Sequence, residues 1–204
     1  MDLPAYINGT AVETGEKLEV RYPWDNSLTG TAALIGPEHL EQAITNALAG
    51  HVEPLTRHER FTILRRAAEL VAEHREELAA LICRETGLCI RDARYETGRT
   101  SDVLEFAAIE AIRDDGQVFS CDISPHGKSR KIFTTRQPVR LVAAITPFNH
   151  PLNQVVHKIA PAIAAGAPMI LKPSDKTPLT ALKVAELLYE AGLPGWMLSV
   201  FVGE

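Results

Sequence analysis

Residues 138–175 constrain the fold of this 204-residue chain more than any other stretch, because they read as strand, helix and strand in succession. An almost continuous apolar run from Val139 to Ile145 predicts a strand buried on both faces, as in a parallel sheet. After the turn 146–150, Pro151 stands where a first helical residue would, since its missing N–H costs nothing there. Apolar residues at helical spacing predict one buried face, formed by Leu152, Val155, Val156, Ile159 and Ile163.

A glycine and a second apolar run complete this unit. Gly166 is typical of a helix end, and residues 167–171 predict a second short strand. Strand, helix and strand of this length form a βαβ unit, so the sequence predicts an α/β fold with a parallel sheet. Ligands of such sheets bind beyond the carboxyl ends of the strands. We therefore expect Asn149 after the first strand, and Lys172 and Asp175 after the second, to face a common crevice.

Shorter patterns predict the remaining elements. Asn8-Gly9 between apolar residues is typical of a hairpin turn, and a capping box at Thr56 opens a long helix that ends at Gly87. Alternating arms at 118–123 and 131–135 predict a β-hairpin within residues 117–136, which is either an ordinary surface hairpin or a contact between subunits. We also expect a strand at 18–22, helices at 39–48 and 92–112, a break at 114–116, a helix from Thr177 that stops at 191–194, and a third parallel strand at 198–202.

Two motifs at a fixed separation make the chain resemble the aldehyde dehydrogenase family. Pro147-Phe148-Asn149-His150-Pro151 matches that family's Pro-aromatic-Asn-x-Pro run, and Lys172-Pro173-Ser174-Asp175 matches its Lys-Pro-Ser-Glu-like run. Asn149 and Lys172 stand 23 positions apart, which is also the family's spacing. The likeness covers essentially the whole chain. Through residues 87–92, 113–122 and 148–154 it is greatest to the branch that acts on phosphonoacetaldehyde.

The resemblance implies the fold and domain organisation of an N-terminal portion. We expect an aldehyde-dehydrogenase-like, truncated α/β fold, with a Rossmann-type parallel sheet, flanking helices and a projecting β-hairpin. Residues 1–204 then form the N-terminal part of an NAD-binding domain, residues 117–136 form the hairpin through which subunits pair, and the catalytic domain is absent. A truncated gene product, an incomplete sequence and one half of a split enzyme stay open as explanations.

The activity implied by the resemblance is the NAD-dependent oxidation of an aldehyde, such as phosphonoacetaldehyde, to the acid. In the family, the nucleophilic Cys and the general-base Glu lie beyond the position where this sequence stops. We therefore expect residues 1–204 alone not to oxidise aldehydes. The alternatives are a non-catalytic module or pseudoenzyme fragment that joins full-length subunits through the hairpin, and a self-standing nucleotide-binding domain.

Asn149 is the catalytic candidate. An amide N–H donor at a strand end can bind the oxyanion that forms when a thiolate attacks an aldehyde carbonyl. An Asn before a Pro is also a common helix cap, and the residues alone favour that interpretation. The family motif favours the other, because its Asn is the oxyanion donor.

The cofactor candidates surround the two strand ends. The resemblance places Lys172 and Asp175 on the adenosine ribose, although a solvated lysine and a charged turn residue are the alternatives. An acidic side chain near the 2′ position repels a 2′-phosphate, which favours NAD over NADP; Lys172 and Lys176 oppose that repulsion, so NADP stays possible. The other residues assigned to the same cleft are Ile145, Thr146, Pro147, Phe148 and Ser174.

Arg99 and His150 are the substrate candidates. In the phosphonoacetaldehyde branch, a histidine at the position of His150 and an arginine on the preceding helix help to bind the phosphonate. A guanidinium and an imidazole suit a dianionic head group. An exposed helix arginine and a packed turn histidine are the alternatives.

Composition and cysteine usage bound the partners and the location. The net charge of −5 argues against a general nucleic-acid partner, and no apolar run is long enough to span a membrane. Cys83, Cys89 and Cys121 cannot pair completely and lack metal-ligand spacing, so we expect no metal and a reducing, cytoplasmic location. None of the three is expected to be the nucleophile. The expected partners are a small, anionic aldehyde and either further copies in a homo-oligomer or a complementing C-terminal chain.

Overall fold

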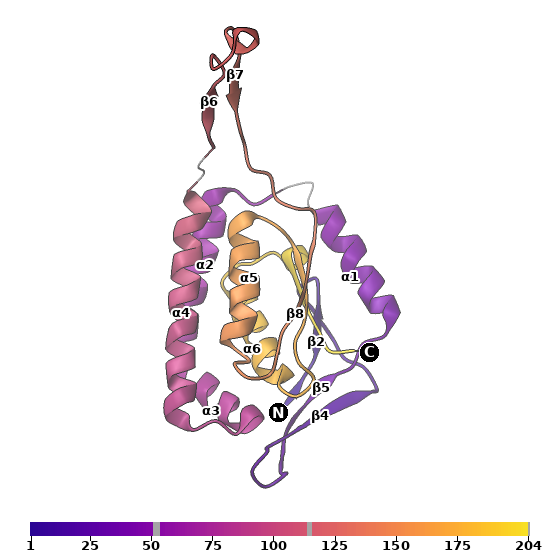
Figure 1. Ribbon diagram of the computed structural model, residues 1–204. Coiled ribbons are helices and arrows are strands. Elements are labelled where there is room, and N and C mark those ends of the chain that lie inside the picture. Colours follow the sequence, from indigo (N-terminus) through magenta and orange to yellow (C-terminus); the bar gives the residue numbers. More distant parts are fainter. Residues whose placement is uncertain (51–53, 114–115, 204) are drawn as a thin grey trace.

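A five-stranded sheet in the order β3-β2-β10-β9-β8 forms the centre of the computed structural model, which describes residues 1–50, 54–113 and 116–203 (Figure 1). Strands β8 (Val142–Ile145), β9 (Met169–Lys172) and β10 (Leu198–Val200) are parallel to one another. Helix α5 (Asn153–Ala165) connects the first two and α6 (Pro178–Glu190) connects the second to the third. The predicted α/β fold, with its βαβ unit and third parallel strand, is confirmed.

The start of α5 differs from the prediction. We expected Pro151 to be the first helical residue, but Pro151 and Leu152 lie in a turn and the helix begins at Asn153. The N–H groups of Leu152 and Asn153 are not left open at the start of the helix. They donate instead to the buried carboxylate of Glu96, which fixes where the helix starts. The end of the helix is as predicted, with Gly166 in the left-handed conformation at φ 75°.

Strand β8 is not buried on both faces, as its apolar run had predicted. Val142 and Ala144 are half-buried, whereas Ala143 and Ile145 are exposed. In the described part of the chain β8 pairs only with β9, so one edge and one face of the strand are uncovered.

The opposite edge of the three parallel strands is covered by the N-terminal hairpin. Strands β2 (Ala5–Ile7) and β3 (Thr10–Val12) form the predicted hairpin, and β2 pairs antiparallel with β10. Asn8 and Gly9 both have positive φ, 51° and 77°, as a tight two-residue hairpin turn requires. The N-terminal hairpin therefore extends the central sheet.

A layer of helices covers the face of the sheet that carries α5 and α6 (Figure 1). It consists of α2 (Arg57–Glu73), α3 (Arg75–Thr86) and α4 (Ile90–Ile112). The capping box between Thr56 and Glu59 is confirmed, but the single long helix predicted after it is wrong. The chain bends at His74 while backbone hydrogen bonds continue on both sides, and the bend lets α3 pack against α4 and α6.

A second sheet and one further helix complete the body. Strands β1 (Asp2–Leu3), β5 (Leu28–Ala33) and β4 (Lys17–Arg21) form a three-stranded sheet, of which only β4 was predicted. Helix α1 (Pro37–Gly50) lies on the other side of the central sheet from α2–α6 (Figure 1). Its bounds agree with the helix predicted at 39–48. Ala43 of α1 packs there with Ile7 and Ile170 of the sheet.

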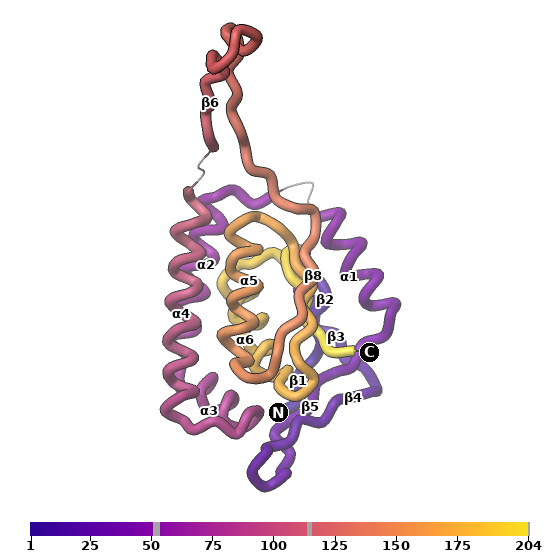
Figure 2. The backbone as a smooth tube through the Cα atoms, in the orientation of Figure 1, coloured from indigo at the N-terminus to yellow at the C-terminus, as the bar shows by residue number. Residues whose placement is uncertain are grey.

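The predicted β-hairpin projects from the body as a separate arm (Figure 2). Its strands, β6 (Val118–Ser120) and β7 (Lys131–Phe133), are shorter than the predicted arms, and a short 3₁₀ turn, η1 (Pro125–Gly127), lies at its tip. A similar turn, η2 (Gly195–Met197), precedes β10. Residues 114–115 of the predicted helix break lie outside the described residues.

Candidate functional site

The ends of β8 and β9 bring the predicted ligand-binding segments side by side. Ile145 is paired with Lys172 across the two strands, and the N–H of Thr146 donates to the carbonyl of Lys172 over 3.2 Å. A cavity of about 410 Å³ lies beside these ends, and Phe148 and Asp175 both line it. The structure thus joins the turn after β8 and the turn after β9 at one edge of the sheet, where ligands of parallel sheets bind.

The turn after β9 carries a pre-formed ion pair. The ammonium Nζ of Lys172 lies 2.7 Å from Oδ1 of Asp175, and both side chains are accessible to solvent. Ser174 Oγ accepts a hydrogen bond from the N–H of Lys176 over 3.3 Å, and the Lys176 ammonium lies 4.6 Å from the centre of the Phe148 ring. A carboxylate, two ammonium groups and an aromatic face are therefore gathered around one turn.

The turn after β8 adds an apolar surface and a hydroxyl without a partner. Ile145, Pro147 and Phe148 are exposed, which is unusual for side chains of this size at a sheet edge. Thr146 is buried, and its Oγ1 has no hydrogen-bond partner among the described residues. Exposed apolar faces next to polar groups that still need partners suit a flat ligand with hydroxyl groups.

Asn149 is exposed, and its side chain makes no hydrogen bond within the described residues. The helix-cap interpretation of Asn149 is wrong, because the residue at the N-cap of α5 is Leu152 and the free N–H groups are bound by Glu96. The amide of Asn149 thus remains available to a ligand.

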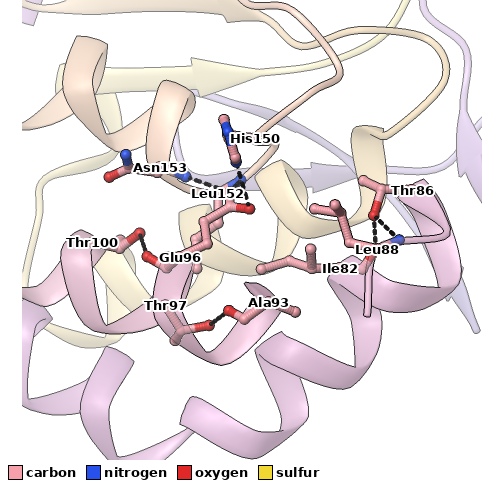
Figure 3. A network of polar contacts seen from close by, with 10 residues as sticks. All are labelled: Ile82, Thr86, Leu88, Ala93, Glu96, Thr97, Thr100, His150, Leu152 and Asn153. Carbon is pink, nitrogen blue, oxygen red and sulfur yellow. Dashed lines mark hydrogen bonds and ion pairs between the residues drawn. The ribbon is translucent and has the colours of Figure 1, made fainter. Parts of the chain in front are cut away.

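Glu96 is the site residue that sequence reasoning missed (Figure 3). It lies on α4 and its side chain is 2% exposed. Its Oε1 accepts hydrogen bonds from the N–H groups of Leu152 and Asn153 over 2.9 and 3.0 Å, and its Oε2 lies 3.3 Å from Nδ1 of His150. The signal in the sequence is a carboxylate on the buried face of a helix, among Ala93, Thr97, Thr100 and Leu104.

Arg99 lies one helical turn beyond Glu96 but faces solvent. Its guanidinium carbon is 5.9 Å from the centre of the Tyr95 ring, and Arg99 forms no ion pair in the part of the chain that the structure describes. No contact joins Arg99 to His150 directly. The two predicted substrate residues are connected only through Glu96, which shares the helix with Arg99 and contacts the ring of His150.

A second buried carboxylate repeats the arrangement at the next helix. Glu85, at the end of α3, accepts hydrogen bonds from the N–H groups of Leu179 and Thr180, over 2.6 and 2.9 Å, and from the Thr180 hydroxyl. Burial raises the pKa of Glu85 to about 7, against the opposing effect of these hydrogen bonds. Glu85 therefore does at the start of α6 what Glu96 does at the start of α5.

The cysteines do not form an activated nucleophile with these groups. Cys83 is half-buried on α3, and burial raises the pKa of its thiol, whereas a reactive cysteine has a lowered one. Cys89 precedes α4 and Cys121 lies in the projecting arm. Among the described residues no group of three or more His, Cys, Asp and Glu side chains could hold a metal ion, and no helix is long and apolar enough to cross a membrane.

A larger cavity, of about 980 Å³, lies away from the predicted site. It is bounded by the start of α2, the end of α4, the end of α5 and the segment that leads from the arm to β8. None of the predicted site residues lines this cavity. The larger of the two cavities is therefore not the one beside the candidate site.

Comparison with known proteins places this geometry in context. The model of the aldehyde dehydrogenase family matches residues 10–204. A 3-sulfolactaldehyde dehydrogenase of Priestia aryabhattai is 38% identical over 199 residues, which are 98% of this chain and 42% of the relative. Aspartate-semialdehyde dehydrogenase 1 of Pseudomonas canavaninivorans is 38% identical over 188 residues, which are 91% of this chain and 40% of the relative.

A solved structure agrees with the sequence comparison. The NADP-dependent glyceraldehyde-3-phosphate dehydrogenase of Bacillus halodurans C-125, complexed with NADP, superimposes with a TM-score of 0.94 at 31% identity; the match covers 100% of this chain and 44% of that one. The chain thus spans about two fifths of the length of the relatives that it matches.

Proposed function

This chain belongs to the aldehyde dehydrogenase family, and we propose that it is the N-terminal part of an NAD-dependent enzyme that oxidises an aldehyde carrying an anionic group. The observation that carries the proposal is the juxtaposition of two turns at the carboxyl ends of β8 and β9. One turn presents an unbonded amide, that of Asn149, and the other presents the Lys172–Asp175 pair.

The residues present fit a dinucleotide. Lys172 and Asp175 would hold the ribose hydroxyls, and the exposed side chains of Ile145 and Phe148 would cover a flat ring. The orphaned hydroxyl of Thr146 is a polar group for which a bound cofactor would supply a partner. When bound, NAD supplies the acceptor for the hydride of the aldehyde.

Asn149 would act on the aldehyde carbonyl. Attack of a thiolate turns the carbonyl oxygen into an oxyanion, and the Asn149 amide N–H donates a hydrogen bond to that oxygen. We assign neither the nucleophile nor the general base to residues 1–204. Cys83 has a raised pKa, Cys121 lies in the arm, and the family resemblance puts both groups later in the polypeptide.

The proposed function is tested by NADH formation in an enzyme that contains residues 1–204 as its N-terminal part. We expect oxidation of phosphonoacetaldehyde, 3-sulfolactaldehyde or a dicarboxylic semialdehyde, and no turnover by residues 1–204 alone. Failure to oxidise any member of a panel of anionic and neutral aldehydes with either NAD or NADP would refute the proposal.

We propose NAD in preference to NADP because of Asp175. Its carboxylate would lie near the ribose and repel a 2′-phosphate, although its ion pair with Lys172 weakens that repulsion. We expect the substitution Asp175→Ser to lower the ratio of kcat/KM for NAD to kcat/KM for NADP. The substitution removes the carboxylate that repels a 2′-phosphate and releases Lys172 from its ion pair. A wild-type preference for NADP, or an unchanged ratio in the variant, would contradict this assignment.

The proposal of an anionic substrate is supported by sequence likeness and by the side chains near the site. The relatives described above are named for 3-sulfolactaldehyde, which carries a sulfonate, and for aspartate semialdehyde, which carries a carboxylate. The resemblance of residues 148–154 to the phosphonoacetaldehyde branch adds a phosphonate. His150 supplies an imidazole beside Asn149, and Arg99 supplies an exposed guanidinium on α4; groups of both kinds bind each of these anions.

Arg99→Ala is expected to raise KM for an anionic aldehyde more than tenfold and to leave KM for a neutral aldehyde nearly unchanged. A hydrogen bond to a charged group contributes about 1.5–3 kcal/mol. Arg91→Ala is the matched control, because Arg91 is an exposed arginine on the same helix that pairs with Asp92. An equal effect of Arg99→Ala on both substrates would contradict the role.

We propose that the projecting arm mediates self-association. Val118, Ile123 and Phe133 are 79%, 93% and 74% exposed, and apolar surface of this kind on an extended hairpin is typical of an interface. Exchanging Val118 and Phe133 for serine is expected to reduce the mass measured by light scattering without unfolding the body. An unchanged oligomer after this exchange, and after deletion of residues 118–133, would count against the interface.

A further inference from the structure

The buried carboxylates of Glu96 and Glu85 each bind the first N–H groups of the helix that follows one of the two site turns. The turn after β8 is fixed at its first end by the pairing of Ile145 with Lys172. At its second end, Glu96 binds the first N–H groups of α5. The turn after β9 is held in the same way, because Glu85 binds the N–H groups of Leu179 and Thr180 at the start of α6. Both carboxylates come from the outer helical layer, so this layer determines where the ligand-binding turns lie.

Glu96 has a contact that Glu85 lacks. Its Oε2 lies 3.3 Å from Nδ1 of His150, the residue that follows Asn149 (Figure 3). A carboxylate oxygen accepts from a ring N–H, so the His150 tautomer that donates to Glu96 is the one with its hydrogen on Nδ1. The other ring nitrogen, Nε2, is then the one left free for a ligand.

The burial of Glu96 makes this arrangement rigid. The side chain is 2% exposed, and no lysine or arginine lies within ion-pair distance of it among the described residues. Its two oxygens are satisfied at the N-terminus of α5 by the two N–H groups and by the ring of His150. All the hydrogen-bond partners of Glu96 named here lie in residues 150–153. Movement of either Glu96 or this segment would therefore leave the buried carboxylate without partners.

We propose that Glu96 is the positioning residue for Asn149, and that it sets the direction of the Asn149 amide and of the His150 ring. This inference rests on the proposed aldehyde dehydrogenase function. Glu96 holds the end of the β8 turn that carries Asn149 and His150, whereas Glu85 holds the helix that follows the turn with the Lys172–Asp175 pair. The two carboxylates therefore predict different kinetic defects when each is replaced.

The test compares Glu96→Gln with Glu85→Gln in the active enzyme that contains this segment. Glutamine keeps an acceptor for the helix N–H groups, but its NH₂ cannot accept from His150. We expect Glu96→Gln to lower kcat about tenfold, since misplacement by a fraction of an ångström has effects of this size, with KM for NAD changed less than twofold. Glu85→Gln should raise KM for NAD more than it lowers kcat. Glu110→Gln is the control, because Glu110 is exposed on the same helix and pairs with Arg113.

Hydrogen exchange supplies a readout that does not depend on turnover. In Glu96→Gln the amides of residues 149–153 should exchange faster, while those of residues 177–181 keep their wild-type rates; Glu85→Gln should give the reverse. Local exchange changes of this kind without activity in the wild type would refute the proposed function and support the positioning role. The inference would be overturned if the two variants changed kcat and KM for NAD in the same proportion. It would also be overturned if amide exchange at residues 149–153 were unchanged in Glu96→Gln.

Discussion

Replacing Asn149 with alanine is expected to lower kcat by about 10²–10³-fold in an enzyme that contains this segment, because loss of one oxyanion donor has an effect of that size. KM for the cofactor should stay nearly unchanged, since the Asn149 amide is assigned to the aldehyde carbonyl and not to the cofactor. The fold should tolerate the change, because the Asn149 side chain is exposed and makes no hydrogen bond within the described residues. The measurement is steady-state and single-turnover kinetics at saturating NAD.

Asn149→Asp sharpens this test. Aspartate has nearly the same size as asparagine, but its carboxylate has no N–H to donate and would repel a developing oxyanion. We therefore expect a rate at least as low as that of Asn149→Ala, with a melting temperature like that of the wild type. A variant that keeps more than a tenth of the wild-type kcat would mean that the oxyanion is bound by another group.

Much of this fold is specified by local patterns, and these were read correctly. Three of these features depend on residues that are close in the sequence. They are the left-handed helix end at Gly166, the tight turn at Asn8-Gly9 and the capping box at Thr56. The apolar face of α5 is equally local, because residues at helical spacing must lie on one side. The structure places each of these features at its predicted position.

The errors have a common physical origin in contacts between distant segments. The start of α5 is fixed by Glu96, which lies 56 positions before Leu152. The exposure of β8 depends on which strand stands beside it, and an apolar run cannot encode that. The bend at His74 depends on α3 packing against α4 and α6. A sequence pattern shows which side of a helix or strand is apolar. The three features depend instead on which other helix or strand packs against it.

The candidate site shows the same division. The residues proposed to face a ligand could be identified because they follow strand ends at a spacing that matches the family's. The residues that hold them, Glu85 and Glu96, were not found, because a glutamate on a helix is ordinarily taken as solvated. Only the buried face on which each one lies distinguishes it from the exposed glutamates of the same helices.

The stability of residues 1–204 is expected to fall as the pH rises from about 4.5 to about 7, because of Glu85. Burial raises the pKa of this carboxyl from 4.5 to about 7 in the folded chain. Between these two pH values the folded state keeps a proton that the unfolded state has released, so a rise in pH favours unfolding. A difference of this size corresponds to about 3 kcal/mol, present in full below pH 4.5 and lost above pH 7.

Protonated Glu85 can keep its hydrogen bonds, which is why the folded state tolerates the proton. With the proton on Oε2, Oε1 still accepts from the N–H of Leu179, and Oε2 can still accept from the N–H of Thr180 while its O–H donates to the Thr180 hydroxyl. Above pH 7 the buried charge is stabilised by these hydrogen bonds and by the N-terminus of α6. The pH dependence thus follows from geometry as well as from burial.

Urea unfolding of the wild type and of Glu85→Gln, at intervals between pH 4 and pH 8, separates this group from all others that titrate. Glutamine does not titrate, so the variant should lose the part of the slope that Glu85 contributes. It should be less stable than the wild type at pH 4.5 and close to it at pH 8, where the wild type bears the buried charge. Parallel pH profiles for the two proteins would show that Glu85 has an ordinary pKa in the folded chain.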